Sequence, residues 1–261
     1  MIKSLVEYLG RQVITFLNFL GGITLLGIRT FSALVRYAPN KLRLLQQAKR
    51  IGIESFPLVS LLAFFQGVIF ALNTAYQMKR LGSEMYIAGI ISVAMARELG
   101  PVITALILAG RIGAAITAEI ATMQVTEQVD ALRTLANDPV RYLVVPRFLA
   151  FTVMLPLLTI YANAVGILGG YMICVHKLNI ASRLYLNITF DSLLFKDLFV
   201  GLIKAAAFGM IVALVSCFEG FSVTGGAEGV GKATTRSVVS SFILIIAADC
   251  LFTALFYFVM P

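Results

Sequence analysis

The chain alternates between long apolar stretches and short polar segments. A helix that crosses a membrane needs about 20 consecutive apolar residues. Five stretches reach that length, and we predict spans over residues 53–76, 85–118, 144–175, 197–218 and 237–259. The second is longer than a span requires, because its roughly 34 residues would extend about 50 Å as a helix. The pattern therefore predicts an all-α integral membrane protein whose second spanning helix projects beyond the bilayer.

The first twenty residues follow a different pattern. Apolar side chains recur at helical spacing over residues 2–20, with charged and polar side chains between them. This spacing predicts an amphipathic helix that lies in the membrane interface. A sixth span near residues 16–35, interrupted by Arg29, is the alternative. We expect two regions: interfacial and elbow helices over 1–50, and a domain of five spans over 51–261.

The basic residues predict the orientation of the spans. Eight lysines and arginines precede the first span, whereas the short loop at 77–84 contains only Lys79 and Arg80. The positive-inside rule then places the N-terminus in the cytoplasm, and five spans place the C-terminus on the outer, periplasmic side. The segments 119–143 and 220–236 become cytoplasmic loops.

Composition supports a membrane protein and argues against a nucleic-acid partner. Hydrophobic residues make up 59% of the chain and charged residues 13%, against about 25% in soluble domains. The net charge of +8 could suggest nucleic-acid binding. However, the basic residues cluster beside the apolar spans, as expected for a protein held at an anionic lipid surface.

Four ionisable residues lie deep within the predicted spans: Arg97 and Glu98 in the second, Lys204 in the fourth and Asp249 in the fifth. Charges at membrane depth are costly, and two positive and two negative groups allow mutual neutralisation. Pro101, which lacks an N–H group, kinks the second helix beside the first pair. We predict a network across these three spans. It either holds the helices together or contacts a charged substrate and exchanges partners during transport.

The loop after the second span is more polar, but its apolar residues still recur at helical spacing. This spacing predicts a short helix near residues 123–138. Thr126 is suited to the N-cap, and Glu127 and Asp130 lie in the first turns, where the helix dipole favours acids. We expect residues 137–139 to end the helix. It is either a solvated connection or a docking helix for a soluble partner, and the capping pattern favours docking.

Two motifs do not support chemistry in this chain. Residues 226–233 approach a phosphate-binding loop, but Ala233 replaces the hydroxyl that holds Mg²⁺, and a span precedes the motif instead of a buried strand. We interpret residues 231–236 as a glycine-rich turn into the last span. The three cysteines and the single histidine, His176, have no metal-ligand spacing. We predict no catalytic residues, no bound metal and no enzymatic activity.

Several short motifs together resemble the MlaE/YrbE permease family, the membrane subunits of ABC transporters that work with MCE proteins. The resemblance covers roughly residues 45–259, and the motifs are Arg97–Pro101, Ala109–Gly113, Ala118–Glu119, Thr126–Gln128, Asp138–Pro139 and Ala233–Arg236.

This resemblance implies a homodimer of five-span subunits in a bacterial inner membrane. A cytoplasmic ATPase would hold ATP and Mg²⁺, leaving this chain without a cofactor, and a ring of MCE-domain protein would sit on the periplasmic face. The family moves phospholipids between the inner membrane and the outer envelope, which maintains outer-membrane lipid asymmetry.

The resemblance also implies site residues. Those near a lipid cavity, in substrate binding or gating, would be Arg97, Glu98, Leu99, Lys204 and Asp249. Those that couple to the ATPase would be Glu119, Thr126, Glu127, Gln128, Asp130 and Leu132. The polar residues Asn73, Thr74 and Gln77 depart from the apolar pattern expected for the outer half of the first span.

Two other functions remain open. A gradient-driven secondary transporter or channel could use the buried charges as an ion relay, and it would often show an internal repeat, which the sequence lacks. A scaffold that only recruits a soluble protein would tolerate neutral residues at all four buried charges.

Overall fold

The computed structural model describes residues 2–36 and 40–259, and every regular element within them is helical. The main helices are α1 (Ile2–Arg36), α2 (Lys41–Gly52), α3 (Phe56–Arg80), α4 (Ile87–Ala94), α5 (Gly100–Leu108), α6 (Ala114–Val125), α7 (Gln128–Thr134), α8 (Val145–His176), α9 (Ser182–Ser192), α10 (Phe195–Phe221) and α11 (Ala227–Val259). Two 3₁₀ turns, η1 (Ile53–Ser55) and η2 (Glu84–Tyr86), lead into α3 and α4. Three π-helical segments, η3 (Met95–Leu99), η4 (Ala109–Gly113) and η5 (Val140–Val144), interrupt the longer helices.

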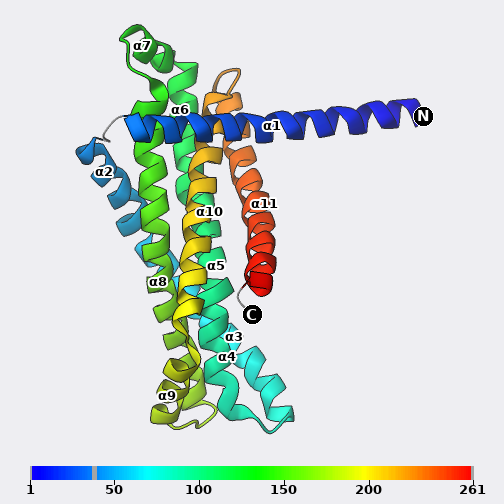
Figure 1. The fold of residues 1–261 in the computed structure, drawn as a ribbon, viewed down its shortest axis with the longest axis vertical. Coiled ribbons are helices and arrows are strands. Elements are labelled where there is room, and N and C mark those ends of the chain that lie inside the picture. Colours follow the sequence, from blue (N-terminus) through cyan, green and yellow to red (C-terminus); the bar gives the residue numbers. More distant parts are fainter. Residues whose placement is uncertain (1, 37–39, 260–261) are drawn as a thin grey trace.

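The long helices run side by side along the long axis of the molecule (Figure 1). α8 packs against both α3 and α10, and α10 also packs against α6 and α11. The largest apolar core is formed where these helices meet, around fully buried side chains such as Phe151, Phe208 and Ile116.

Small residues let α3 and α8 approach closely. A Cβ atom added at Gly67 would lie 1.8 Å from the carbonyl oxygen of Gly166, and one added at Gly169 would lie 2.4 Å from that of Phe64. Contacts this short leave no room for any side chain larger than hydrogen. Close backbone packing at small residues is a common source of helix association in lipid.

All five predicted spans coincide with long apolar helices. Within the described residues six helical stretches are long and apolar enough to cross a membrane. Four of them contain a predicted span, and a fifth covers the last predicted span except for its final residue. These five run over Lys41–Arg80, Glu84–Val125, Val140–His176, Phe195–Phe221 and Ala227–Phe258.

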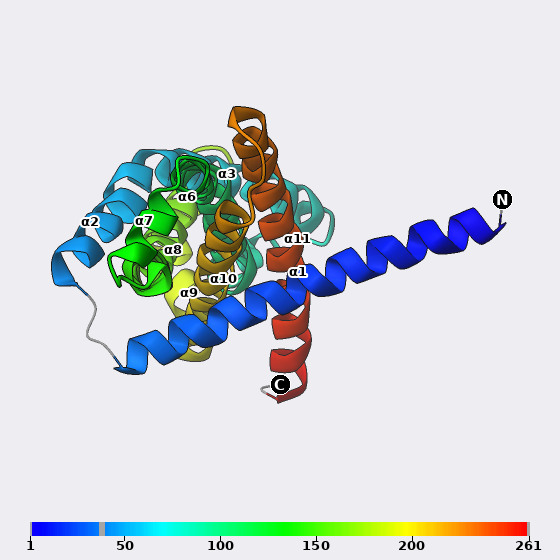
Figure 2. The same cartoon turned by 90° about the horizontal axis from the view of Figure 1, so that it is seen from above.

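The sixth stretch is Val13–Arg36, within α1. α1 is one continuous helix over both the predicted amphipathic segment and the alternative span. It runs across the bundle instead of along it, and its N-terminal half extends beyond the other helices (Figures 1 and 2).

The structure corrects one local expectation. Residues 231–236 are not a turn, because α11 begins at Ala227 and includes them. The turn lies earlier, where Gly225 has a φ of 89° that favours glycine, and the ion pair between Glu228 and Lys232 (2.7 Å) then supports the first turns of α11.

The structure also contains α9, a helix that the sequence analysis did not predict in the loop after α8. It is held by Tyr185, which is fully buried, donates a hydrogen bond to the carbonyl of Ile167 (3.3 Å) and packs edge-on against Tyr171. Burial raises the pKa of the Tyr185 hydroxyl, so this group remains a hydrogen-bond donor at physiological pH.

Candidate functional site

Lys204 lies at the centre of a charged network that joins three helices. Its side chain is fully buried on α10, and its Nζ atom donates to Glu98 Oε2 (2.6 Å), Asp249 Oδ1 (2.9 Å) and Thr253 Oγ1 (2.7 Å). Thr253 in turn donates to Glu98 Oε1 (3.1 Å). All three donors of the ammonium group therefore have partners. The predicted network across the second, fourth and fifth spans is confirmed for Glu98, Lys204 and Asp249, and Thr253 completes it.

A π-helical segment places Glu98 in this network. η3 directly precedes Gly100 and Pro101, and Pro101 has no N–H group with which to continue an ordinary α-helical turn. At this wider turn, α10 packs very closely against η3. A Cβ atom on Gly201 would lie 2.0 Å from the carbonyl oxygen of Ala96. α10 thus approaches η3 closely enough for Lys204 to reach Glu98.

Arg97 lies outside the Lys204 network. Its Nη1 atom lies 3.4 Å from Oδ1 of Asp197, a nearly buried carboxylate at the start of α10. The other oxygen of Asp197 accepts the backbone N–H of Leu194 (3.3 Å) and so caps the helix. The sequence prediction missed Asp197, although an acid three residues after a helix start is a recognisable capping signal.

Arg97, Glu98 and Thr253 line an open groove of about 670 Å³. Its other walls are mainly apolar or aromatic and include Ile90 and Tyr257. The groove thus presents a cation, a carboxylate and a hydroxyl beside an apolar surface, between the α4–η3 helix and α11. Leu99, although predicted here, instead packs against the apolar cluster around Ile91 and Met95.

Glu119 lies within the bundle, six residues before the end of α6. Its Oε2 atom pairs with Arg50 on α2 (2.7 Å), and its Oε1 atom pairs with Arg147 on α8 (2.7 Å). Arg147 is almost fully buried and also donates to the carbonyl of Leu143 (2.9 Å). Glu119 therefore connects three helices just below the loop that contains α7.

The loop helix exists but is shorter than predicted, and it begins differently. α7 spans Gln128–Thr134 and lies at the far end of the molecule (Figure 1). Thr126 is not its N-cap, because its hydroxyl donates back to Thr122 at the end of α6 (2.9 Å). Glu127 occupies the cap position with a left-handed φ of 60°, which reverses the chain between the two helices.

The remaining predicted coupling residues lie on α7 itself. Asp130 forms an exposed ion pair with Arg133 (2.8 Å), Gln128 is exposed and Leu132 is half-buried. Val129 is fully buried and fixes the helix against the protein. α7 thus has a polar exposed surface and is held to the protein by the buried side chain of Val129.

Comparisons with known proteins identify the family of this chain. A family model described as Permease MlaE matches residues 44–255, which is most of the chain. The chain belongs to the MlaE permease family.

This MlaE-family permease is similar over nearly its whole length to curated bacterial proteins. It is 40% identical to a probable ABC transporter permease protein of Rickettsia felis, over 98% of this chain and 99% of that one. It is 33% identical to the intermembrane phospholipid transport system permease protein MlaE of Haemophilus influenzae, with the same coverage. It is also 38% identical to the chloroplastic protein TRIGALACTOSYLDIACYLGLYCEROL 1 of Arabidopsis thaliana, over 82% of this chain and 61% of that one.

Family membership and the six long apolar helices identify a multi-pass inner membrane protein of the ABC transporter permease kind. Within the MlaE permease, the charged groove and the α7 loop lie toward opposite ends of the bundle, because α4 and α7 mark those ends (Figure 1). The two predicted sets of site residues are therefore spatially separate, and one continuous helical run from Glu84 to Val125 connects them.

Proposed function

We propose that this chain is the membrane subunit of an ATP-driven transporter that moves phospholipids between the inner membrane and the outer envelope, and so supports outer-membrane lipid asymmetry. The observation that carries the proposal is the groove, in which charged side chains and an apolar wall lie within one opening. A phospholipid needs both, because its phosphate is anionic and its chains are apolar.

In this proposal Arg97 binds the lipid phosphate. Its contact with Asp197 is 3.4 Å, longer than the 2.7–2.9 Å of a strong charge-assisted hydrogen bond, and about a third of its side chain is exposed. Arginine also offers paired donors that match phosphate oxygens. The acyl chains pack against Ile90 and Tyr257 on the groove wall.

The Lys204 network sets the width of the groove. Because Glu98 and Asp249 share one ammonium group, η3 and α11 cannot separate without breaking a buried contact. An exchange of partners among these groups would open or close the wall during a transport cycle. Glu98 and Thr253, which belong to the network and also line the groove, connect lipid binding to that movement.

The energy for lipid extraction has to come from a partner protein. Each methylene of a lipid chain contributes about 0.8 kcal/mol to burial in the bilayer, so extraction requires a coupled energy source. We propose that a cytoplasmic ATPase holding ATP and Mg²⁺ docks on α7 through Glu127, Gln128, Asp130 and Leu132, and that Glu119 transmits its movement to α2 and α8.

The rest of the assembly follows from the same proposal. Two copies of the chain form a homodimer, α1 lies in the cytoplasmic interface, and a ring of MCE-domain protein covers the periplasmic face. The N-terminus is cytoplasmic and the C-terminus periplasmic.

The first experiment is a mild-detergent pull-down of the full chain from its native membrane, with mass spectrometry of proteins and lipids. We expect an ATPase, an MCE-domain protein and bound phospholipid. Recovery of the chain without ATPase and lipid would contradict the proposal. Transport driven by an ion gradient without ATP would instead support a secondary transporter, which the buried Lys204 network would also suit.

Two variants localise the functions. Arg97→Gln should reduce the co-purified phospholipid several-fold, whereas Arg183→Gln, an exposed arginine on α9, should not. Glu127→Gly removes a side chain at a left-handed position without straining the backbone, so reduced ATPase recovery would identify a direct contact. Unchanged lipid and ATPase in these variants would exclude the two assigned roles.

A further inference from the structure

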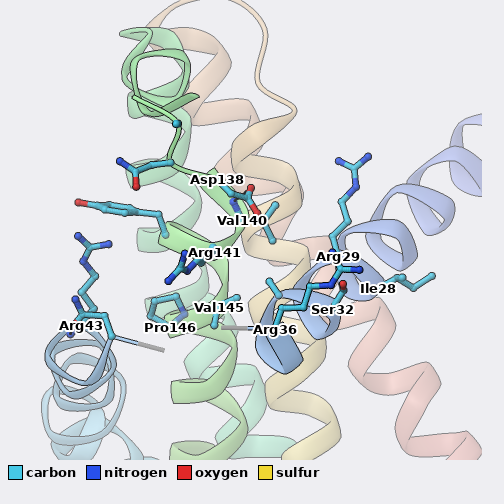
Figure 3. A pocket seen from close by; sticks show the side chains of 15 residues that line it. Ile28, Arg29, Ser32, Arg36, Arg43, Asp138, Val140, Arg141, Val145 and Pro146 are labelled. Carbon is cyan, nitrogen blue, oxygen red and sulfur yellow. Dashed lines mark hydrogen bonds between the residues drawn. The ribbon is translucent and has the colours of Figure 1, made fainter. Parts of the chain in front are cut away.

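A second cavity, of about 1020 Å³, lies where α1, the start of α2 and the loop between α7 and α8 meet (Figure 3). Arginines from three elements line it: Arg29 and Arg36 from α1, Arg43 from α2 and Arg141 from η5. Asp138 is the single carboxylate among the described residues that line this cavity. The cavity therefore has a strong excess of positive charge.

The helices present these arginines together. Arg29 and Arg36 are seven residues apart, two turns of helix, so they share one face of α1 with Ser32 between them. On the opposite side, the guanidinium of Arg43 lies over the Tyr142 ring, 3.3 Å from its centroid. Figure 3 shows α1 and α2 on opposite sides, with the segment that carries Arg141 between them.

The one carboxylate that lines the cavity cannot balance four guanidinium groups. Oδ1 of Asp138 accepts the backbone N–H of Val140 (3.0 Å) and caps the turn into η5. Among the described residues no carboxylate forms an ion pair with Arg29 or Arg36, both of which are exposed. Several cations in one concave site attract an anion, and guanidinium groups bind phosphate oxygens in pairs.

The surroundings favour a lipid as the source of that phosphate. Ile28 lines the cavity, and the large apolar side chains Phe31 and Val35 beside it on α1 are 66% and 75% exposed. Such side chains on a basic amphipathic helix are stabilised by acyl chains. α7 lies farther along the long axis of the molecule than α1 (Figure 1). A protein docked on α7 would therefore contact the part of the α6–α8 loop that is farthest from α1.

We infer that this basic cavity binds the phosphate headgroup of an anionic phospholipid from the leaflet on which α1 lies. The bound headgroup joins α1 to α2 and η5, with the acyl chains along the apolar side chains of α1. This site lies toward the end of the bundle opposite the Glu98 groove. The inference rests on the proposed interfacial position of α1 but not on lipid transport, because it concerns a bound lipid that need not move.

The absence of tryptophan from the chain allows a direct test. Ile28→Trp places a single fluorophore at the cavity in the purified full chain. The chain, in detergent micelles, is titrated with brominated phosphatidylglycerol or brominated phosphatidylcholine, and bromine quenches the fluorescence on contact. Arg29→Gln/Arg36→Gln is compared with Arg11→Gln, which removes a charge from the same helix outside the cavity.

We expect saturable quenching by phosphatidylglycerol at concentrations where phosphatidylcholine quenches weakly. The double variant should weaken this binding at least tenfold, because it removes two of the four guanidinium groups that line the cavity. Arg11→Gln should change it less than twofold. Equal quenching by both lipids, or equal effects of both variants, would overturn the inference. Complete displacement by millimolar inorganic phosphate would also overturn it, in favour of a free-phosphate site.

Discussion

Arg147 is almost completely buried, and among the described residues Glu119 supplies the one carboxylate that pairs with it. Its Nη2 atom pairs with Glu119 and its Nη1 atom with the carbonyl of Leu143, whereas its buried Nε atom has no hydrogen-bond partner. A buried cation that loses its partner is strongly destabilising, whereas removing both charges is far less costly. Arg147 is therefore a sensitive point for the stability of the bundle.

Glu119→Gln should lower the free energy of unfolding by about 2 kcal/mol, which is less than the roughly 3–5 kcal/mol of a fully buried pair because Glu119 is partly exposed. Adding Arg147→Met should restore part of this loss. The matched control is Glu228→Gln, whose pair with Lys232 is largely exposed and whose loss should cost under about 0.5 kcal/mol.

The cysteines provide the measurement. Cys174 and Cys217 are buried and Cys250 is exposed. In a Cys250→Ser background, a thiol-reactive dye therefore reports unfolding directly as temperature rises. If the double variant is less stable than Glu119→Gln alone, the ion pair is not the source of the effect.

The sequence shows which charged residues lie deep within the spans, but it does not reveal every residue that pairs with them. Glu98, Lys204 and Asp249 could be predicted to meet because charges within apolar spans need neutralisation. Asp197, the partner of Arg97, was missed because its position three residues after the N-cap Leu194, which is a capping signal, was not considered. Thr253 was missed because a hydroxyl group in a spanning helix usually bonds its own backbone.

At the scale of elements, three π-helical segments share a feature that the sequence pattern does not reveal. η3, η4 and η5 each contain one arginine: Arg97, Arg111 and Arg141. Arg111 donates to the backbone carbonyl of Glu54 and lies 3.4 Å from the Ser55 hydroxyl, at the junction before α3. An extra residue in a turn shifts the helical register, and periodicity analysis assumes that the register is constant.

The contact between α3 and α8 gives the clearest prediction at this scale. Gly67→Ala should force the two helices apart, because the new methyl group would lie 1.8 Å from the Gly166 carbonyl oxygen. Overpacking of this kind costs about 1–3 kcal/mol. Gly231→Ala in α11 meets nothing within 4 Å and should leave stability unchanged or raise it slightly.

The dye assay with Cys250→Ser measures both glycine variants. Equal melting temperatures for Gly67→Ala and Gly231→Ala would show that α3 and α8 are free to separate without loss. The outcome bears on mechanism, because a rigid α3–α8 pair confines any opening movement to α10, α11 and the η3 region.

For the whole molecule, the basic residues beside the spans predict the orientation in the membrane. Leu81 lies in the turn after α3 and Thr224 in the turn before α11, and both are exposed. In the Cys250→Ser background, Leu81→Cys should react with a membrane-impermeant maleimide added outside intact cells. Thr224→Cys should react only after permeabilisation. The reverse pattern would invert the predicted topology.

The position of α1 needs a separate test. If α1 lies in the cytoplasmic interface, Gly10→Cys and Lys41→Cys should both be protected in intact cells, since both ends of α1 are then on one side. If residues 13–36 cross the membrane, one of the two cysteines will react from outside. Hydropathy could not decide this, because α1 is long and apolar enough to span and yet runs across the bundle (Figure 2).

Because the helix runs without a break from Glu84 to Val125, a small tilt at one end would displace residues far along it by several ångströms. Glu98 lies about 27 residues before Val125, which at 1.5 Å per residue is an arm of roughly 40 Å. A tilt of about 5° imposed at the α7 turn would displace Glu98 by about 3.5 Å, more than the length of its bond to Lys204 (2.6 Å). If α10 stays in place, a small movement at the α7 turn would therefore be enough to break the contact between Glu98 and Lys204. The two π-helical segments within the run, η3 and η4, are the places where the arm could flex and reduce this displacement.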